Sequence, residues 1–588
     1  MRIKHFFGLA VIAAMTASCS SNNDLVNGGN GENETGASYA SITINLPTTS
    51  GTRAKNDNFD GGTASEYAVN DATLVIFKKG AATSENDYQY VETAPLGNLE
   101  PWKKDNTEGN GITTEATITA ELKQATVGEK GDYYALVILN NKDKNDAEKI
   151  TLPTGTTTYG KWNVATNATE TKLVDNTKGF YMANAPEFTT ANDEPTTLVP
   201  IKGIYRTKEE AQSKPGTTVH VERGLAKVTV GKGIGKDYFT GAKASGSKYS
   251  NDDVTITNWA LDVTNKSSFP VHVTAGLKSG VTSTDQTVTG YEDIWKNEAT
   301  STAPATSRFV SQLSATGAFK RVYWGIDPNY SMGLTKLDKC KEQFTLVKAD
   351  GSDAVWKAST EPLYCLENTF DIKNMTQGQT TRVLLKATYT PSAVASETDK
   401  TFFMIGNSSD IWTTTTLKAQ IASKAKEALS LTTDPTVVLG EDLLKGGTHF
   451  LTTENVSIKD GETEKVNTPG LVDKLNNKLG LDKTNGVGIK TYKNGESYYI
   501  ARIKHFGDDL TPWNAGDGTY DGNNLNWLGR YGVLRNNWYD LTINKISGPG
   551  YPDVPKVNPD VPDDEDTKYI NVEVKILDWA KRSQSVDL

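Results

Sequence analysis

The chain has 588 residues and a formal net charge of −10 at pH 7, from 62 Lys and Arg residues against 72 Asp and Glu residues. This length exceeds that of one ordinary domain, so two or more hydrophobic cores are expected. An acidic balance without a basic stripe argues against nucleic-acid binding. Short alternating runs between turn residues predict an all-β protein.

The amino terminus has the pattern of an export signal over residues 1–18. Arg2 and Lys4 precede a short apolar stretch at 6–15, which is too brief to span a bilayer as a mature helix. Small residues then lead to Cys19, as in the lipid-bearing cysteine of bacterial lipoproteins. We therefore expect Cys19 to carry a lipid such as palmitate. The alternative is ordinary signal-peptidase cleavage after Ser18.

A polar leash and a single strand follow the signal. The leash, to about residue 38, has almost no apolar content and cannot fold alone. The strand then alternates polar residues with Ala40, Ile42, Ile44 and Leu46, which predicts one buried face. A potential cut site comes directly afterwards at Arg53 and Ala54, and Lys55 is an alternative for a less selective protease. We expect residues 19–53 to be removed on maturation.

Residues 54–222 are expected to form the first β-domain. Strands are predicted at 71–77 and 133–139, and the continuous apolar character of the second indicates a central strand buried on both faces. Near residue 224 the inward parity changes from Val219 and Val221 to Ala226 and Val228. Because Gly224 lies at this change, we expect a bulge or a strand break there and place the domain boundary beside it.

Residues 223–547 are expected to form the second β-domain, with strands at 258–263, 381–387 and 498–503. Two helices are also predicted. One stripe aligns Leu417, Ile421, Ala425 and Leu429 at four-residue intervals. The other begins after Thr468 and Pro469, aligns Leu471, Leu475 and Leu479, and ends at Gly480. Both helices are interpreted as insertions that pack on the sheets.

The chain then changes character between 548 and 567. Five prolines between 549 and 562 are followed by four acidic residues at 563–566, a composition that favours extended polyproline II. At about 3.1 Å per residue, residues 549–567 would span roughly 60 Å, enough to reach another molecule. The alternative is a linker to a strand that folds back onto its own domain.

The terminal segment, 568–588, repeats the pattern of the first strand. Ile570, Val572, Val574 and Ile576 alternate with polar residues, and Trp579 follows them. If residues up to Arg53 were cut away, the groove of the first strand would stand open. We therefore predict that residues 568–588 form a donor strand that fills this groove in a neighbouring copy.

No catalytic or cofactor-binding arrangement is indicated, so neither enzyme activity nor a cofactor is expected. His220, His272, His449 and His505 have no ligand spacing, and residues 56–61 lack the acidic spacing of a calcium loop. Cys340 and Cys365 are the remaining cysteines after Cys19, and export would permit a disulfide between them. Two buried free thiols are the alternative.

Several stretches of the chain resemble the type V fimbrial shaft subunits of the Bacteroidales, in the branch with the major subunit of the short (minor) fimbriae. The matching stretches are SYASITINLP with GTRA after it, YYALVILNN, GFYMAN at 179–184, VERGLAKVTV at 221–230, VLRNNWYDLTINKI at 533–546 and VEVKILDWAKRSQSVDL at the end. The resemblance implies two transthyretin-like β-sandwich domains, a lipoprotein precursor in the outer membrane, an Arg-directed maturation protease and assembly by donor-strand exchange.

This resemblance also implies a location and partners. The expected location is a cell-surface fimbrium that supports adhesion, colonisation and biofilm formation, and the partners are copies of this chain and accessory anchor and tip subunits. A surface glycan-binding lipoprotein is the rival class, since 11 Trp and 24 Tyr could stack on sugar rings. Those aromatics are dispersed along the chain, and this role explains neither Arg53 nor the terminal strand. An anchor or a tip subunit is the alternative within the fimbrial class.

Overall fold

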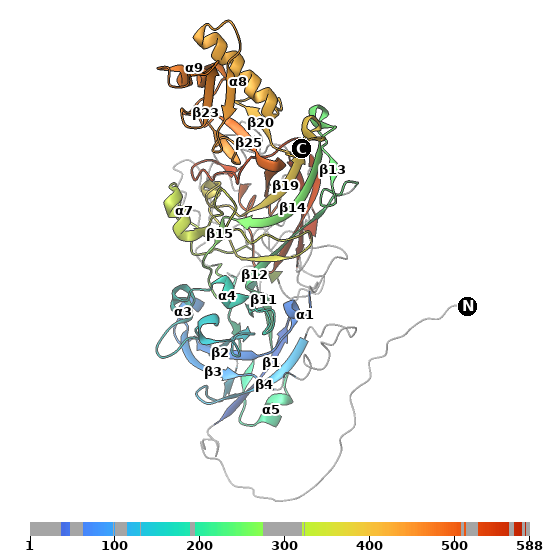
Figure 1. The fold of residues 1–588 in the computed structure, drawn as a ribbon. Coiled ribbons are helices and arrows are strands. Elements are labelled where there is room, and N and C mark those ends of the chain that lie inside the picture. Colours follow the sequence, from blue (N-terminus) through green and yellow to red (C-terminus); the bar gives the residue numbers. More distant parts are fainter. Residues whose placement is uncertain are drawn as a thin grey trace, which may run out of the picture.

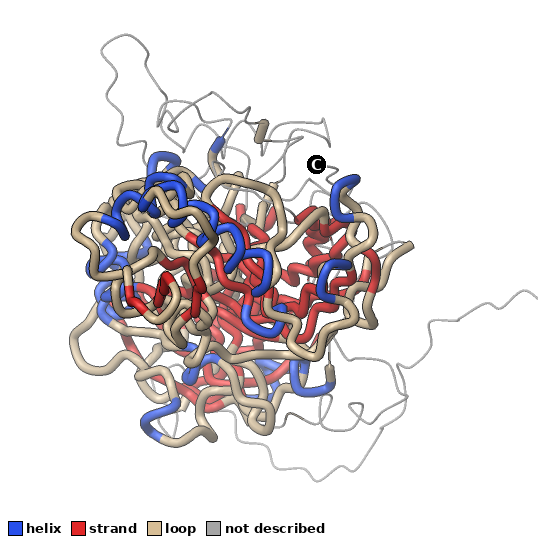
Figure 2. The backbone as a smooth tube through the Cα atoms, turned by 45° about the horizontal axis from the view of Figure 1, so that its top comes forward, coloured by secondary structure: helices blue, strands red, loops and turns tan. Residues whose placement is uncertain are grey.

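The structure, a computed structural model, describes residues 37–46, 63–97, 99, 115–129, 131–188, 195–233, 235–274, 320–322, 324–506, 511–512, 527–563, 570–578 and 582–583. Cys19, Arg53, Ala54 and Trp579 lie outside these ranges. Three parts follow one another along the molecule: a curled sheet, a pair of stacked sheets and a lobe that carries two helices (Figure 1). Strands occupy the centre and helices lie at the periphery (Figure 2), so the all-β class is confirmed.

The first part is one sheet in the order β3-β2-β6-β7-β11-β1-β4. Its strands are β1 (Ser38–Asn45), β2 (Ala72–Lys78), β3 (Gln89–Pro95), β4 (Glu115–Leu122), β6 (Tyr133–Leu139), β7 (Met182–Asn184) and β11 (Thr217–Arg223), and the short β9 (Val199–Pro200) pairs with β6 outside this order. As predicted, β6 is buried on both faces. One face joins the core around β1, and the other packs beneath α3 (Tyr159–Ala165) and α4 (Glu170–Leu173).

The two outer strands of this sheet approach each other through a buried carboxylate. Glu92 of β3 accepts hydrogen bonds from the backbone N–H groups of Lys123, Gln124 and Ala125, just beyond the end of β4, at 2.8, 2.9 and 2.7 Å. A carboxylate that accepts several N–H groups satisfies donors that a sheet edge would otherwise leave unpaired. The sheet is therefore curled around its core.

Gly224 separates the first part from the second, as the parity change predicted. β11 ends at Arg223, and the next strand, β12, begins at Leu225 in a different sheet. A Cβ at residue 224 would lie 3.2 Å from side-chain atoms of both Leu173 and Tyr181, so the close packing there favours glycine. The domain limits themselves stay a prediction.

The second part consists of two sheets that share one core. The first has the order β18-β12-β27-β28-β29, and the second β13-β14-β19-β26. Their strands are β12 (Leu225–Lys232), β13 (Ala242–Lys243), β14 (Asp253–Asp262), β18 (Leu363–Leu366), β19 (Arg382–Thr390), β26 (Glu496–Arg502), β27 (Asn537–Ile546), β28 (Ile570–Asp578) and β29 (Arg582–Ser583). Val228 and Leu541 from one sheet pack with Trp259 and Leu385 from the other. The finer transthyretin-like layout stays a prediction.

Both predicted helices are present in the lobe, which is inserted between β19 and β26. They are α8 (Thr414–Leu429) and α9 (Leu471–Lys478), with a side-chain cap from Thr413 at the start of α8. Leu417, Ile421 and Leu475 are completely buried in a core of their own. The lobe's strands are β20 (Phe402–Ile405), β21 (Thr436–Leu439), β22 (Gly447–His449), β23 (Val456–Asp460), β24 (Thr463–Glu464) and β25 (Ile489–Tyr492).

The remaining α-helices and strands of the described chain are short. They are α1 (Ala64–Tyr67), α5 (Lys208–Gln212), α7 (Leu337–Gln343), β5 (Gly128–Glu129), β8 (Glu187–Phe188), β10 (Gly203–Ile204), β15 (Thr264–Asn265), β16 (Lys320–Arg321) and β17 (Phe344–Thr345). Among the described residues, no helix has the length and apolar content needed to cross a membrane.

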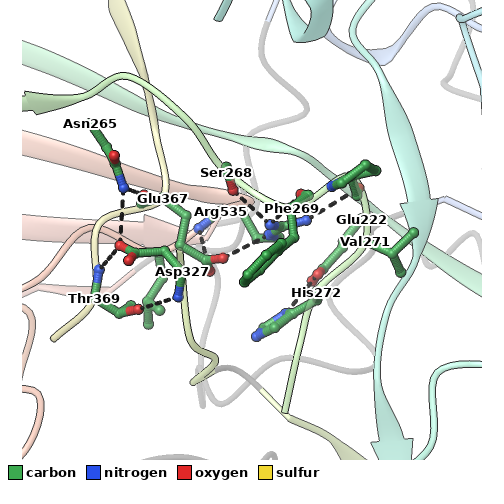
Figure 3. Close-up of polar contacts among 12 residues, drawn as sticks. Glu222, Asn265, Ser268, Phe269, Val271, His272, Asp327, Glu367, Thr369 and Arg535 are labelled. Carbon is green, nitrogen blue, oxygen red and sulfur yellow. Dashed lines mark hydrogen bonds and ion pairs between the residues drawn. The ribbon is translucent and has the colours of Figure 1, made fainter. Parts of the chain in front are cut away.

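Buried polar contacts lie where the curled sheet meets the paired sheets (Figure 3). The Arg535 guanidinium donates from Nε to Oε2 of Glu367 at 3.0 Å and from Nη2 to Ser268 Oγ at 3.0 Å. On the side of the curled sheet, Glu222 of β11 lies 2.8 Å from Nδ1 of His272. These side chains are almost wholly buried, and each has a polar partner, as burial requires. The contact between Glu222 and His272 therefore joins the two parts, and the contacts of Arg535 lie beside it in the second part.

Candidate strand-exchange site

β1 lies in the interior of its sheet, between β4 and β11. It runs antiparallel to β4, from the pair Ser38 and Leu122 to the pair Asn45 and Glu115, and parallel to β11, where Ile42 pairs with Thr217. Both backbone edges of β1 thus take part in ladders. Without β1, the facing edges of β4 and β11 would expose unpaired N–H and C=O groups, which is a template for another strand.

The inward side chains of β1 are those that the alternation predicted to be buried. Ala40, Ile42 and Ile44 are 0% exposed, and Leu46, directly after β1, is 4% exposed, in one core with side chains of β2, β4, β6 and β11. On the opposite face, Thr43 Oγ1 lies 2.9 Å from Thr117 Oγ1 of β4. The groove occupied by β1 is therefore apolar on one side and lined by backbone groups along both edges.

A buried ion pair holds the chain in place soon after the predicted cut site. Arg53 and Ala54 lie outside the described residues, but Glu66 of α1 is completely buried. Its carboxylate lies 2.8 Å from Lys227 Nζ of β12 and accepts hydrogen bonds from Tyr364 Oη and from the N–H of Thr63, the latter at 2.8 Å. Glu66 therefore ties the region after the cut to the second part of the molecule.

The electrostatics of this contact favour the charged form of Glu66. Burial acts to raise the pKa of Glu66, but the charge of Lys227 and the hydrogen bonds from Lys227, Tyr364 and Thr63 outweigh it and hold the pKa below its ordinary value. Sequence reasoning missed this contact. Its members, Glu66, Lys227 and Tyr364, are distant in the chain, so no local pattern in the sequence brings them together.

β28, the predicted donor strand, pairs with β27 of the same chain. The antiparallel register joins Val572 to Ile543 and Val574 to Leu541. On its other edge, within the residues that the structure describes, β28 pairs with the short strand β29. In the single chain the terminal strand therefore takes the position that the fold-back alternative describes. β1 and β28 belong to different sheets, and their exchange between molecules stays a prediction.

The proline-rich stretch is not a free tether over residues 551–563, which corrects the prediction made for it. Tyr551 exchanges two backbone hydrogen bonds with Tyr498 of β26, and Val554 N–H donates to Ala349 O at 2.9 Å. Asp563 forms a buried ion pair with Arg502. Tyrosine and valine between the prolines give the stretch apolar surface to bury, and composition alone did not reveal the surface that receives it.

The predicted disulfide is also wrong, because Cys340 and Cys365 are both free and buried. Cys340 on α7 lies 3.7 Å from Leu334 O, whereas Cys365 on β18 is in the core of the paired sheets. Burial raises the pKa of both thiols, which keeps them protonated at neutral pH. The free-thiol alternative therefore holds.

The histidines within the described chain each have a separate local contact. His220 pairs with Glu187, His449 with Lys445 O and His505 with Tyr539 Oη. Across the described residues no group of three or more His, Cys, Asp or Glu side chains is arranged to hold a metal ion. The region at 56–61 lies outside the described residues.

Residues 490–585 match a family model described as "Major fimbrial subunit protein type IV, Fimbrillin, C-terminal". The match covers β26, β27, β28 and β29, and it confirms over this region the resemblance to fimbrial subunits. No curated protein matches the sequence.

Several solved structures are similar to the chain at low identity. A putative cell adhesion protein from Parabacteroides distasonis has a TM-score of 0.36 at 9% identity, covering 93% of this chain and 98% of that one. A fimbrilin (FimA) from Porphyromonas gingivalis has a TM-score of 0.29 at 12% identity, covering 93% and 99%. The tip fimbrial protein Mfa3 of the same organism, with a C-terminal truncation, has a TM-score of 0.28 at 9% identity, covering 92% and 100%.

Proposed function

We propose that this chain is a structural shaft subunit of a cell-surface fimbrium. The precursor is exported, lipidated at Cys19 and held at the outer membrane until an Arg-directed protease cuts between Arg53 and Ala54. The cut releases β1, and residues 568–588 of the next copy replace it. The match of residues 490–585 to the fimbrillin C-terminal model supports the fimbrial class. Anchor and tip subunits are the expected partners at the two ends of the filament.

One observation carries this proposal: β1 fills the middle of a sheet, yet the segment that joins it to the rest of the chain contains the predicted cut site. Its side chains Ala40, Ile42, Ile44 and Leu46 belong to the core. Burying four aliphatic side chains contributes about 6–12 kcal/mol before ordering entropy is subtracted. A cleaved subunit that has lost β1 therefore gains much from any strand that restores this burial.

β28 is suited to be that strand. Its long ladder is to β27, and its other edge carries the two-pair ladder to β29, whereas β1 is paired over longer stretches on both edges, with β4 and with β11. Ile570, Val572, Val574 and Ile576 match the β1 set in number and period. Because donor and acceptor are different surfaces of the same chain, the contact is head-to-tail and generates an open filament.

A pair of cysteine crosslinks tests the exchange directly. If the donor takes the direction and register of β1, Glu573 replaces Thr43 and faces Thr117 of β4. The variant Glu573→Cys with Thr117→Cys should then form disulfide-linked ladders between cleaved subunits. The matched control combines Glu573→Cys with Thr542→Cys, which are partners in the β27–β28 register and should crosslink within the precursor.

The two crosslinks distinguish the exchanged state from the folded-back state. The control variant should crosslink within one chain before trypsin cleavage, and the variant with Thr117→Cys should crosslink between chains only after cleavage. If cleaved subunits kept only the intrachain product and formed no filaments by electron microscopy, the terminal strand would complete its own molecule and the proposal would be wrong.

A further inference from the structure

The chain between β27 and β28 is bound to the body along residues 551–563, here called the C-terminal strap. At its start, Tyr551 and Tyr498 exchange backbone hydrogen bonds of 2.7 and 2.8 Å. In its middle, Val554 packs with Leu384 and Ile500, and Val557 joins a separate apolar cluster. The strap is therefore held by both backbone and apolar contacts, although it is rich in proline.

Two buried arginines lie beneath the strap. Arg382 Nη2 donates to the carbonyl of Pro555 at 2.6 Å while it forms an ion pair of 2.7 Å with Asp262. Arg502 Nε lies 2.7 Å from Asp563 Oδ1, and these two side chains are 3% and 1% exposed. A buried charge is expensive unless it is paired and hydrogen bonded. The strap thus supplies groups that the body needs.

Asp563 is the last residue of the strap and the most firmly held. Besides Arg502, its carboxylate accepts from Thr380 Oγ1 at 2.6 Å, and its backbone N–H donates to Met375 O at 3.1 Å. Next to it, Gln377 N–H donates to Val561 O at 3.0 Å. Side chain and backbone both fix this position, which is the last described residue before β28.

We propose that Asp563 is a positioning residue for donor-strand exchange, because it anchors the point from which the terminal strand leaves its own subunit. This inference rests on the proposed function. The chain from Asp563 to Ile570 reaches at most about 25 Å even when fully extended, against roughly 60 Å for an arm that starts at residue 549. The anchor therefore restricts the neighbour to a narrow range of positions and gives the filament a regular subunit repeat.

The first experiment tests the anchor in the uncut precursor, without any filament. Hydrogen exchange should show protected amides in the strap, and Asp563→Asn should increase their exchange rates at least tenfold. The milder variant Thr380→Val should have a smaller effect of the same sign. The matched control is Glu367→Gln, which removes the charge of an equally buried partner of Arg535 far from the strap in sequence (Figure 3). It should leave strap exchange unchanged.

If the amides of the strap exchanged at the wild-type rate in both Asp563→Asn and Thr380→Val, Asp563 would not be the anchor of the strap. If Glu367→Gln raised the exchange rates of the strap by the same factor, the effect would be a general destabilisation of the fold. That result would also refute a specific anchor at Asp563. Because this measurement uses the precursor, it decides the anchor even if subunits of every variant fail to polymerise.

The second experiment measures the subunit repeat in filaments grown from trypsin-cleaved subunits. Wild-type and Glu367→Gln filaments should have the same regular repeat by electron microscopy, whereas Asp563→Asn filaments should be sparser and irregular. If Asp563→Asn raised the exchange rates of the strap but left the subunit repeat of the filaments unchanged, Asp563 would have no positioning role. Wild-type subunits that form no filaments would refute the proposed function and, with it, the positioning role, while the hydrogen-exchange result for the strap would stand.

Discussion

β1 and β28 have the same alternating pattern, yet the fold holds them differently. β1 has a ladder on each edge, to β4 and to β11, and its inward side chains are buried. β28 has a long ladder on one edge only, to β27. An internal strand cannot leave without opening both ladders, whereas a strand near an edge can detach from one side. We therefore expect β1 to need a covalent cut for its release and β28 to exchange without one.

The largest effect is expected from Arg53→Ala, which tests the need for a cut. The uncut precursor should keep β1 in place and form no filaments, because the groove stays filled. N-terminal sequencing of wild-type surface filaments should begin at Ala54. Normal filaments from the variant, or a mature terminus elsewhere, would contradict the prediction. Arg206→Ala, in the loop before α5, is the control and should polymerise normally.

A nearly complete loss of assembly is also expected when β28 carries charges at its apolar positions. Val572→Asp with Val574→Asp would bury two unpaired carboxylates in the groove, at a cost of several kcal/mol. Cleaved subunits should remain folded by circular dichroism but should not raise light scattering. Glu573→Gln with Lys575→Gln changes the opposite parity, and this control should assemble. Assembly of the aspartate variant would exclude these valines from the contact.

An intermediate effect on filament growth is expected when a buried side chain of β1 is truncated, but not when one in a strand that remains in the subunit is truncated. Ile42→Ala in β1 and Ile76→Ala in β2 each truncate a fully buried side chain of the same core. Each should lower the unfolding free energy of the precursor by about 2–5 kcal/mol in urea. After cleavage, only Ile42→Ala should speed filament growth, because it weakens the strand that must leave. Equal growth rates for the two variants would contradict this distinction.

The smallest effect concerns the pH dependence of the contact that fastens the chain after the cut. The pKa of Glu66 is held below its ordinary value in the folded protein, so its contribution is fully present above about pH 4.5 and is lost as pH falls through the folded pKa. Stability should therefore decline on acidification by at most about 1.4 kcal/mol per pH unit from this group. Glu66→Gln should remove that part of the slope in thermal melts at several pH values.

Local patterns predicted much of the fold because they depend on neighbours in the chain. Alternation located β1, strand-like runs located β2 and β26, and four-residue spacing located α8 and α9. The parity change at Gly224 located a strand break, because inward and outward residues cannot exchange within one regular strand. The match of residues 490–585 to the fimbrillin C-terminal model agrees with the resemblance found at 533–546 and in the terminal segment.

Contacts between distant residues were beyond such patterns. Prolines indicated an extended segment, but only the fold brings Arg502 of β26 and Arg382 of β19 beneath it. Spacing permitted a disulfide between Cys340 and Cys365, yet the fold places one thiol on α7 and the other in the core of the paired sheets. A disulfide requires specific Cα separations and directions that spacing does not contain.

The sequence by itself determined which segments alternate, and hence that two strands of similar chemistry lie at opposite ends of the chain. The tertiary structure decided how tightly each is held, because ladder pairing and burial depend on the strands beside it. It also decided that the polypeptide is fastened at Glu66 after the cut site and at Asp563 before the terminal strand. Buried carboxylates need charge or hydrogen-bond partners, and only folding brings Lys227 to Glu66 and Arg502 to Asp563.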